Sequence, residues 1–357
     1  MPGVEGGILY PADELRAFTV AAFKNVGVSP EDAEVVTDSL IEANLRGVDT
    51  HGITRMLTVY IKRLQVGVVN KETEIKVVRE NASTALVDAR NSLGQVAGKR
   101  AMEMAIGKAK QTGIGFVALA HTNHFGACAY YSMMALPHDM IGYSATNSPV
   151  SVAPWGGRTP MFGTNPLSYS IPAGEERPFV LDFATTVVAR GRIILHAKQN
   201  RPLEPGWAFD AAGRPTIDPE AALKGLLAPI GGYKGYGLMM MIDLMCGVMT
   251  GSNYGTHFPG FLADNLKDPS DIGSMFMAIS IDSFIDPAEF KAGVDKALRE
   301  IKACALAEGA ERIYIPGEIE FETKEERLAN GIPLPKEVVR DFVALGQELG
   351  IPFPDRS

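Results

Sequence analysis

The chain is predicted to be a mixed α/β (α+β) protein, and three observations predict this class. Short apolar runs typical of buried strands occur at residues 114–120, 140–144, 179–183 and 275–281. Segments with helical spacing of apolar residues alternate with these runs, for example at 94–112 and 287–307. Thirty-seven glycines and 23 prolines indicate many tight turns. The 357 residues suffice for two or three domains that share a large core.

Composition and charge restrict the partners. The net charge of −8, with dispersed basic residues, argues against nucleic acid. Leu238 to Met249 is the longest apolar run, but it contains Asp243 and is too short to span a bilayer, so we expect a buried core helix. Three widely spaced cysteines fit reduced thiols in a cytoplasmic protein, and no signal peptide is visible.

The N-terminal stretch is predicted to be helical. Spacing predicts a helix over 11–26, and Ser29-Pro30 is a strong start for a second one. The segment 46–55 that follows is too polar and glycine-rich for a core. If residues 53–64 are helical, His51 lies at that helix's N-terminus, where the dipole favours neutral imidazole, and Arg55 lies one turn along. The alternative is a capped turn between helices with a surface arginine.

The next elements lead to a second polar segment. Residues 74–78 and 85–88 are predicted to form a strand pair, and 94–112 a helix. The strand 114–120 then runs into a turn that carries His121 and His124, and further helical spacing follows. Two histidines between a buried strand and a helix can act as acid, base or ligand near neutral pH. The alternative is that one of them caps the helix or bonds a backbone carbonyl.

Two later segments also carry candidate functional groups. The strand 179–183 holds Asp182, which needs a partner because burying an unpaired carboxylate is costly. It orients a histidine, accepts bonds from a ligand, or pairs with Arg190. Gly231 to Gly237 then opens the apolar helix, and its Lys234 makes the turn a candidate anion or phosphate site. A strand is predicted at 275–281 and a helix at 287–307. A short strand at 312–315 and helices at 325–330 and 336–349 are predicted to follow.

Several common signatures are missing. No Gly-x-Gly-x-x-Gly follows a strand, so there is no Rossmann fingerprint. There is also no His-Glu-x-x-His and no Cys/His quartet at zinc spacing, so no metal site is predicted.

Four motifs, in order along the chain, together resemble the malate/L-lactate dehydrogenase family. They are Arg46-Gly47-Val48-Asp49-Thr50-His51-Gly52-Ile53-x-Arg55, Gly163-Thr164-Asn165-Pro166, Leu181-Asp182-Phe183-Ala184-Thr185 and Gly232-Tyr233-Lys234-Gly235-Tyr236-Gly237-Leu238. This family is unrelated to the Rossmann-type enzymes and also holds ureidoglycolate and sulfolactate dehydrogenases, diketogulonate reductase and cyclic-imine reductases. The similarity runs from about Leu15 to beyond Gly317.

The resemblance implies a non-Rossmann NAD(P)-binding fold with a largely antiparallel sheet, in a homodimer. It implies a helical domain of residues 1–70 completed by 318–357. A central mixed α/β domain would comprise 71–120 and 230–317, and an NAD(P)-binding domain 121–229.

The resemblance also implies site residues. The family's functional histidines fall on His51 and His124, and its arginine falls on Arg55. We assign Asp182 with the histidines to catalysis, and Thr50, Thr164 and Asn165 with Arg55 to the substrate. Cofactor contacts would fall on Ser148, Asp182, Phe183, Ala184, Lys234, Gly317, Glu318 and Ile319.

We therefore expect a cytoplasmic oxidoreductase that transfers a hydride between NAD or NADP and a small (S)-2-hydroxy acid or its 2-oxo acid. A positioned imidazole would take the hydroxyl proton, and we favour His124 over His51. Ureidoglycolate or sulfolactate dehydrogenase of the same family is an alternative. A metal-dependent hydrolase using His51, His121 and His124 is a second, and a non-catalytic ligand-binding protein is a third. The acid and the preferred cofactor stay open.

Overall fold

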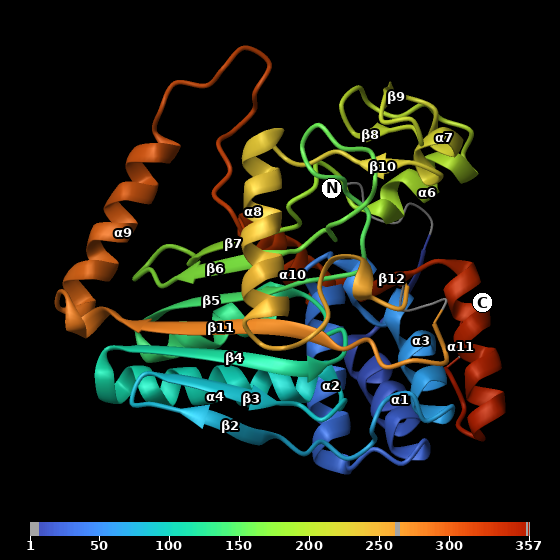
Figure 1. Ribbon diagram of the computed structural model, residues 1–357. Coiled ribbons are helices and arrows are strands. Elements are labelled where there is room, and N and C mark those ends of the chain that lie inside the picture. Colours follow the sequence, from blue (N-terminus) through green and yellow to red (C-terminus); the bar gives the residue numbers. More distant parts are fainter. Residues whose placement is uncertain (1–6, 261–264, 355, 357) are drawn as a thin grey trace.

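A computed structural model describes residues 7–260, 265–354 and 356, and its centre is a mixed sheet (Figure 1). Seven strands lie in the order β2-β3-β4-β11-β5-β6-β7. Only the pair β3–β4 is parallel, and every other neighbouring pair is antiparallel. The strands are β2 (Lys76–Glu80), β3 (Thr84–Asp88), β4 (Ile114–Thr122), β5 (Met140–Thr146), β6 (Leu167–Ile171), β7 (Phe179–Phe183) and β11 (Ile272–Ser280). The predicted mixed α/β class and the largely antiparallel sheet are confirmed.

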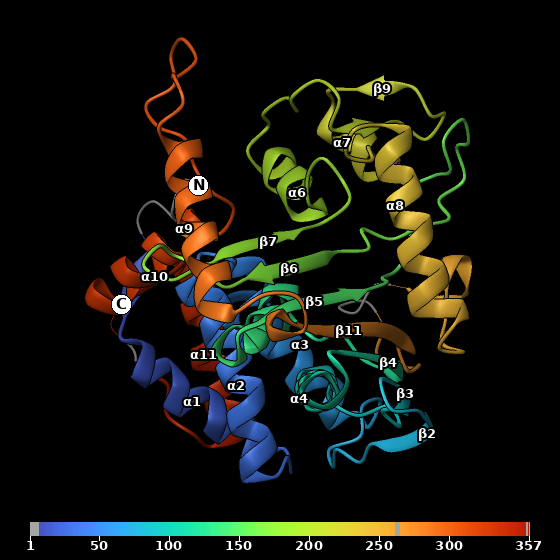
Figure 2. The same cartoon turned by 90° about the vertical axis from the view of Figure 1, so that its left-hand side faces the viewer.

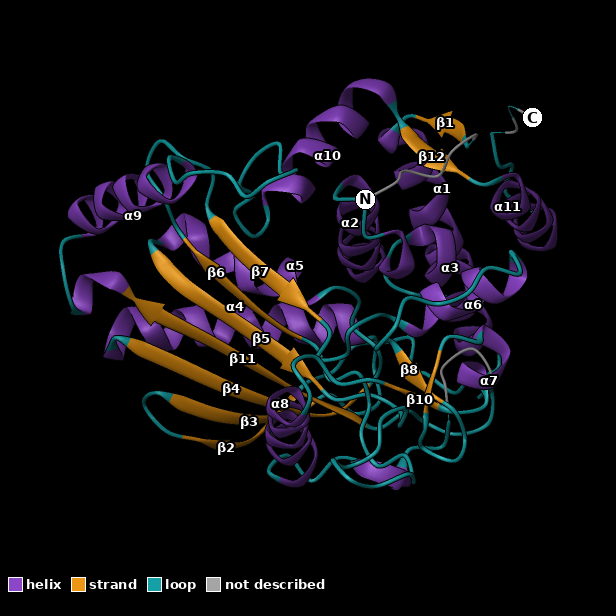
Figure 3. Ribbon diagram, turned by 90° about the horizontal axis from the view of Figure 1, so that it is seen from above, coloured by secondary structure: helices purple, strands orange, loops and turns teal. Residues whose placement is uncertain are grey.

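Helices cover both faces of this sheet. On one face, α4 (Gly94–Thr112) and α5 (Cys128–Ser132) pack over an apolar cluster that includes Val117, Tyr131 and Phe276. On the other face, α8 (Tyr233–Asp243) and the π-helical turn Leu244–Val248 pack over Ala145 and Met275 (Figure 3). The turn approaches β11 closely because residue 273 is glycine. A Cβ there would lie 1.6 Å from the Cys246 carbonyl oxygen.

The second layer is a helical unit built from both ends of the chain. It comprises α1 (Ala12–Asn25), α2 (Pro30–Leu45), α3 (Ile53–Gln65), α10 (Glu318–Asn330) and α11 (Lys336–Leu349). Strands β1 (Ile8–Tyr10) and β12 (Ile332–Leu334) pair antiparallel and join the two ends. As predicted, Ser29 caps α2, since its hydroxyl accepts the Asp32 N–H at 3.1 Å. A single apolar cluster joins α1, α2 and α3 to β12 and α11, which supports our proposal that 1–70 and 318–357 form one domain.

A small unit stands above the sheet and the terminal helices (Figures 1 and 2). It contains α6 (Arg190–Lys198), α7 (Pro219–Leu223), β8 (Ala208–Phe209), β9 (Pro215–Thr216) and β10 (Leu226–Leu227). The last three form a sheet in the order β10-β8-β9. The remaining helix, α9 (Pro287–Lys302), lies beside the β6–β7 end of the large sheet.

Three expectations need correction. Residues 312–315 form no strand, and α9 ends at Lys302 rather than Ala307. The helix predicted over 325–330 begins earlier, at Glu318.

The apolar helix beyond Gly237 differs most from its prediction. Met239, Ile242 and Cys246 are buried against the sheet as expected. The outward side is not buried, because six large apolar side chains there are at least 36% exposed: Leu238, Met240, Met241, Leu244, Val248 and Met249. The prediction of a fully buried helix is wrong, since apolar composition does not say whether a helix is covered by its own chain. Within the described residues, no helix is long and apolar enough to cross a membrane.

Candidate active site

Two histidines far apart in sequence stack on one another. The His51 and His124 ring centroids are 5.5 Å apart, with 19° between the ring planes. His51 ends a short 3-10 helix, Asp49–His51, directly before α3, and His124 lies in the loop after β4. The 3-10 helix is fixed through Asp49, which pairs with Arg327 at 2.7 Å and accepts a bond from Asn44 at 2.7 Å. The fold thus brings two of the predicted catalytic residues into contact.

The His51 ring is bonded to its neighbour Thr50, with 2.9 Å between Thr50 Oγ1 and His51 Nδ1. Burial, followed by the nearby Arg55 guanidinium, lowers the pKa of His51 to about 4. Arg55 itself is exposed, and among the described residues no carboxylate lies within ion-pair distance of it. Its Nη1 faces the first turn of α6, 3.0 Å from where a Cβ on Gly191 would stand. An unpaired cation therefore lies beside a neutral imidazole.

The His124 ring has its Nδ1 surrounded by donors. The Tyr60 hydroxyl lies 2.6 Å from Nδ1, and the Gly126 backbone N–H donates to the same atom at 3.3 Å. A backbone N–H can only donate, so Nδ1 is the acceptor and the neutral ring carries its proton on Nε2. Burial, followed by the electrostatic interactions with His51 and Arg55, lowers the pKa of His124 to about 3. The ring is thus neutral at physiological pH and offers a fixed N–H donor.

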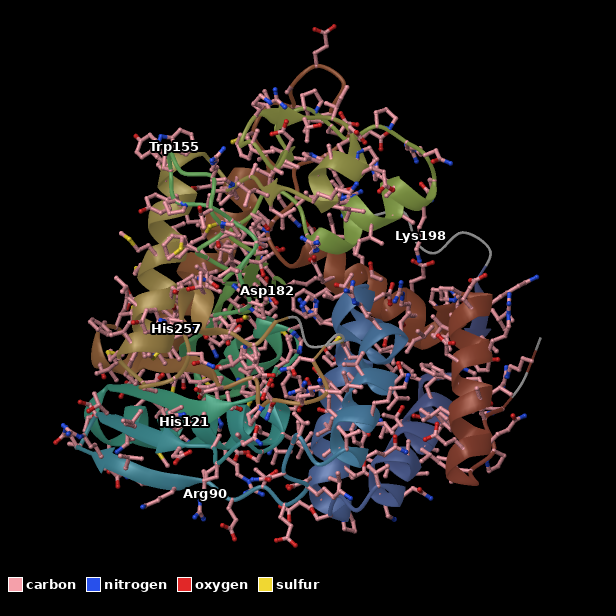
Figure 4. All side chains as sticks on the ribbon, turned by 45° about the vertical axis from the view of Figure 1, so that its right-hand side comes forward. Arg90, His121, Trp155, Asp182, Lys198 and His257 are labelled. Carbon is pink, nitrogen blue, oxygen red and sulfur yellow. The ribbon has the colours of Figure 1, made fainter. Side chains whose placement is uncertain are left out.

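Asp182 lies at the end of β7, in the middle of the molecule, between the sheet and the terminal helices (Figure 4). Its carboxylate accepts the Ala129 N–H at the start of α5 at 2.8 Å. Solvent reaches the side chain, yet protein surrounds it, and this desolvation raises the pKa of Asp182 to about 6. The Ala129 bond and the Arg46 charge oppose the rise. The arginine acting on Asp182 is therefore Arg46, whereas Arg190 donates to the Leu223 carbonyl at 3.0 Å.

The Gly-Thr-Asn-Pro motif holds the Ser148 loop. The Ser148 hydroxyl accepts the Thr164 N–H at 3.0 Å, and the Asn165 side chain accepts the Ser148 N–H at 3.1 Å. Asn165 is fully buried and also donates to the Met239 carbonyl at 3.0 Å. Both ends of its amide are engaged, so we assign Asn165 a positioning role and no contact with substrate. Thr164 is partly accessible and stays a candidate for such a contact.

The glycine-rich turn connects directly to the end of β7. The Ile230 N–H donates to the Thr185 carbonyl at 2.9 Å. Thr185 directly follows Phe183 and Ala184, two of the predicted cofactor contacts. Helix α8 begins at Tyr233, earlier than predicted, so Lys234 lies in its first turn. Lys234 is exposed, and no ion pair to it exists within the described part of the chain. A free ammonium group at a helix N-terminus suits an anion.

Residues 317–319 lie on the other side of β7. Gly317 has a φ of 91° and packs against Val180, where a Cβ would come within 2.8 Å. The Glu318 carboxylate pairs with Lys302 and accepts the Ile315 N–H at 3.0 Å. Ile319, in the first turn of α10, is partly accessible. Glu318 thus has local partners, and its predicted cofactor contact would come through the backbone.

Two site residues escaped the sequence reasoning. Tyr60 lies on the buried face of α3, where its spacing is that of an ordinary core residue. Arg46 belongs to the first motif but received no role. It is buried over the Phe321 ring, and its Nη1 has no hydrogen-bond partner among the described residues. Only its place at the start of the polar, glycine-rich segment 46–55 could have signalled it.

The third histidine of the hydrolase alternative is engaged elsewhere. His121 is the penultimate residue of β4, and its Nδ1 lies 2.7 Å from Asp271, beside Asn253. The described residues contain no group of three or more His, Cys, Asp or Glu side chains arranged to hold a metal ion. Without that cluster, the hydrolase alternative loses its physical basis.

The site thus combines a stacked pair of neutral histidines with Arg55, which has no ion-pair partner among the described residues. Comparison with known proteins identifies the family. The family model for malate/L-lactate dehydrogenase matches residues 10–343, and the chain belongs to this family.

The relatives are similar over nearly their whole length. The L-sulfolactate dehydrogenase of Methanocaldococcus jannaschii is 40% identical over 98% of this chain and 99% of its own. The malate dehydrogenase of Pyrococcus horikoshii is 38% identical over 97% of each chain. The solved structure of the Methanocaldococcus jannaschii sulfolactate dehydrogenase superposes with a TM-score of 0.91 at 38% identity, covering 97% of this chain and 98% of that one.

The names of two more distant relatives state which cofactor they use. The ureidoglycolate dehydrogenase (NAD(+)) of Escherichia coli is 32% identical over 89% of this chain and 90% of its own. The (2R)-3-sulfolactate dehydrogenase (NADP(+)) of Chromohalobacter salexigens is 33% identical over 93% and 96%. The family thus comprises NAD(P)-dependent hydroxy acid dehydrogenases, which confirms the predicted class of enzyme and cofactor.

Proposed function

We propose that the chain interconverts a small (S)-2-hydroxy acid and its 2-oxo acid, with NAD or NADP as the hydride partner. The observation that carries the proposal is the neutral His51–His124 stack beside Arg55, which has no ion-pair partner among the described residues. A planar guanidinium suits a carboxylate, and its charge already acts on both imidazoles. Substrate bound by Arg55 therefore has its reacting oxygen near the histidines.

The hydrogen-bond pattern gives the two rings different roles, one as a hydrogen-bond donor and the other as the proton acceptor. Because His124 carries its proton on Nε2, it donates a hydrogen bond to the substrate oxygen and has no free lone pair there. The Thr50 hydroxyl can accept the Nδ1–H of His51, which leaves the Nε2 lone pair of His51 to take a proton. The sequence favoured His124 for proton transfer, and this geometry leads us to propose His51 instead.

Several residues fit a nicotinamide cofactor. The unpaired Lys234 suits a phosphate, and the accessible Asp182 carboxylate suits a ribose hydroxyl. The buried Arg46, with its partnerless Nη1, lies near that carboxylate. The site would be completed by residues in β7, next to it, or in the loop that bonds to Thr164: Ser148, Phe183, Ala184 and Gly317 to Ile319. When bound, the cofactor supplies or accepts the hydride.

The test is a screen of 2-oxo acids with reduced NAD and NADP, followed by nicotinamide absorbance. The panel includes oxaloacetate, pyruvate and sulfopyruvate, and the reverse reaction is run with malate, sulfolactate and ureidoglycolate. Turnover of a 2-oxo acid that is lost in Arg55→Met supports the proposal. Purified, folded protein that binds cofactor but turns over no member of the panel would contradict it.

We further propose that the enzyme is a homodimer formed through the outward side of α8. In Figure 2, α8 lies at the edge of the drawn chain, away from the terminal helices. Its six exposed apolar side chains form a surface of the kind that is normally buried. In a symmetric dimer, this surface of one chain would pack against the same surface of the other chain. The C-terminal helix α11 packs on α1 and α3 of its own chain.

The cytoplasm is the proposed compartment. Cys128 and Cys246 are buried free thiols and Cys304 is an exposed one. Free thiols fit a reducing compartment. Fractionation of cells that express the protein at its native level tests the assignment.

A further inference from the structure

Helix α6 approaches Arg55 at a glycine. Gly191 lies in the first turn of α6, and a Cβ built on it would stand 3.0 Å from Arg55 Nη1 and 4.0 Å from Thr50 Cγ2. Among the described residues, no other atom outside α6 comes within 4 Å of that position. The guanidinium group of Arg55 therefore occupies the space that a side chain at residue 191 would need.

The two helices that meet here are anchored separately. In α6, Ile193 is 1% exposed and belongs to the apolar cluster of the small unit. In α3, Ile53 and Leu57, on either side of Arg55, are fully buried in the cluster of the terminal helices. Because each backbone is held by its own core, the distance between Gly191 and α3 is fixed by the packing of the two units. Only the Arg55 side chain can adjust to it.

The backbone conformation of α6 does not require a glycine at this position. The φ of Gly191 is not positive, and the residue is helical. Glycine is less favourable than alanine in a helix, so local structure argues against it here. The close approach of Arg55 is the feature that a side chain would disturb.

We propose that Gly191 is a positioning residue for Arg55: the missing side chain lets the guanidinium group lie against α6, beside Thr50. In the proposed reaction, on which the functional meaning of this inference rests, that guanidinium binds the substrate carboxylate. A methyl group at residue 191 would stand closer to Nη1 than ordinary van der Waals contact allows, so the guanidinium would have to move by a few tenths of an ångström. Arg55 is a long, exposed side chain and can move in this way without disturbing the fold.

The direct tests need no substrate. Gly191→Ala should unfold at the same or a higher temperature than the wild type, because alanine favours the helix and only Arg55 must yield. In the ¹⁵N spectrum of the arginine side chains, the resonance missing from Arg55→Met is that of Arg55, and it should shift in Gly191→Ala. Gly293→Ala is the matched control, because Gly293 lies in α9 and its Cβ position is open among the described residues. It should leave the Arg55 resonance in place.

Kinetics with a 2-oxo acid give the functional readout. Gly191→Ala should raise KM about threefold or more and change kcat less than about twofold, since it moves a group that binds substrate. Gly191→Leu fills more of the space and should raise KM further. With Arg55→Met already present, Gly191→Ala should change kcat/KM by less than about twofold, because the group on which it acts is gone. Gly293→Ala should leave these constants unchanged.

Any of three results would overturn the inference. A clearly lower unfolding temperature of Gly191→Ala would show that the glycine serves the fold. An Arg55 resonance that does not move in the folded variant would show that residue 191 does not position the guanidinium, and an equal loss of kcat/KM with and without Arg55 would show that it acts elsewhere. If Gly191→Leu fails to fold, Gly191→Ala decides. Because unfolding and the spectrum need no turnover, they test the contact even if no 2-oxo acid is reduced and the proposed function itself fails.

Discussion

The imidazole of His51 stacks on that of His124, and each ring has its Nδ1 bonded to a hydroxyl, of Thr50 and Tyr60 respectively. The similarity ends there, because only His124 receives a second donor, the Gly126 N–H. One ring is thereby fixed as a hydrogen-bond donor, and the other is left free to exchange a proton. This asymmetry underlies the predictions on catalysis.

The two histidines are expected to differ in their pH profiles. His51→Asn should lower kcat by about 10²–10⁴-fold, the usual effect of losing a positioned acid or base, and remove the titrating limb. His124→Asn should also lower kcat, by about 10²–10³-fold, but keep the limb, because it removes a fixed donor. The measurement is turnover against pH with one substrate. A limb that disappears in His124→Asn and persists in His51→Asn would reverse the roles.

Arg55 is expected to act on substrate affinity and on the His51 pKa together. Arg55→Met should raise KM for the acid, because it removes the partner of the substrate carboxylate. It should also raise the pKa of His51 from about 4, since the guanidinium charge contributes to lowering it. The pH dependence of kcat/KM for 2-oxo acid reduction should then move to higher pH. If KM increased but the pH profile did not shift, the proposed effect of Arg55 on the pKa of His51 would be contradicted.

Stability is expected to fall as the medium becomes mildly acidic. The pKa values of His51 and His124, about 4 and about 3, lie below the ordinary value of about 6.5 in the unfolded chain. Between about pH 6.5 and 4, the unfolded chain binds protons that the folded chain does not, so the free energy of unfolding decreases as pH falls. Urea unfolding at pH 7 and pH 5 measures the loss. It should shrink in a His51→Asn/His124→Asn variant and stay unchanged in His138→Asn, whose side chain is exposed.

Lys234 is expected to contribute to cofactor binding rather than to chemistry. Lys234→Ala should weaken nicotinamide cofactor binding about tenfold or more, as a lost hydrogen bond to a charged group does. Turnover at saturating cofactor should change much less. Fluorescence titration of the reduced cofactor gives the affinity, and Lys224→Ala is the control, since Lys224 is exposed on the small unit. Equal affinities in both variants and the wild type would remove Lys234 from the site.

The α8 face is expected to hold two copies together. Leu244→Asp places a charge among the exposed apolar side chains and should convert the dimer to a monomer at micromolar concentration. Phe284→Asp is the matched control, because Phe284 is 79% exposed and lies before α9. Light scattering coupled to size exclusion gives the mass. A wild-type monomer, or a dimer that survives Leu244→Asp, would contradict this interface.

Local sequence patterns predicted many of the elements. Spacing alone placed α4 at residues 94–112, and the Ser29-Pro30 cap located the start of α2. These predictions succeed because capping and helical periodicity are local interactions. The strand predicted at 312–315 failed because a short run has too little periodicity to separate strand from loop.

The four motifs, taken together, determined the family and hence the antiparallel sheet, the cofactor class and a set of site residues. The arrangement of those residues was decided only by the tertiary structure. Contact between His51 and His124 requires α3 and the end of β4 to meet, and no pattern along the chain encodes that meeting. Tyr60 resembles a core residue because it lies on the buried, largely apolar face of α3.

The sequence likewise did not show that the outward side of α8 is exposed within one chain. Apolar composition indicates that a surface is favourably buried, but it does not identify what buries it. The sequence by itself determined which groups are present and which local elements carry them. Only the fold decided which nitrogen of each histidine is free, because that depends on donors that arrive from other elements.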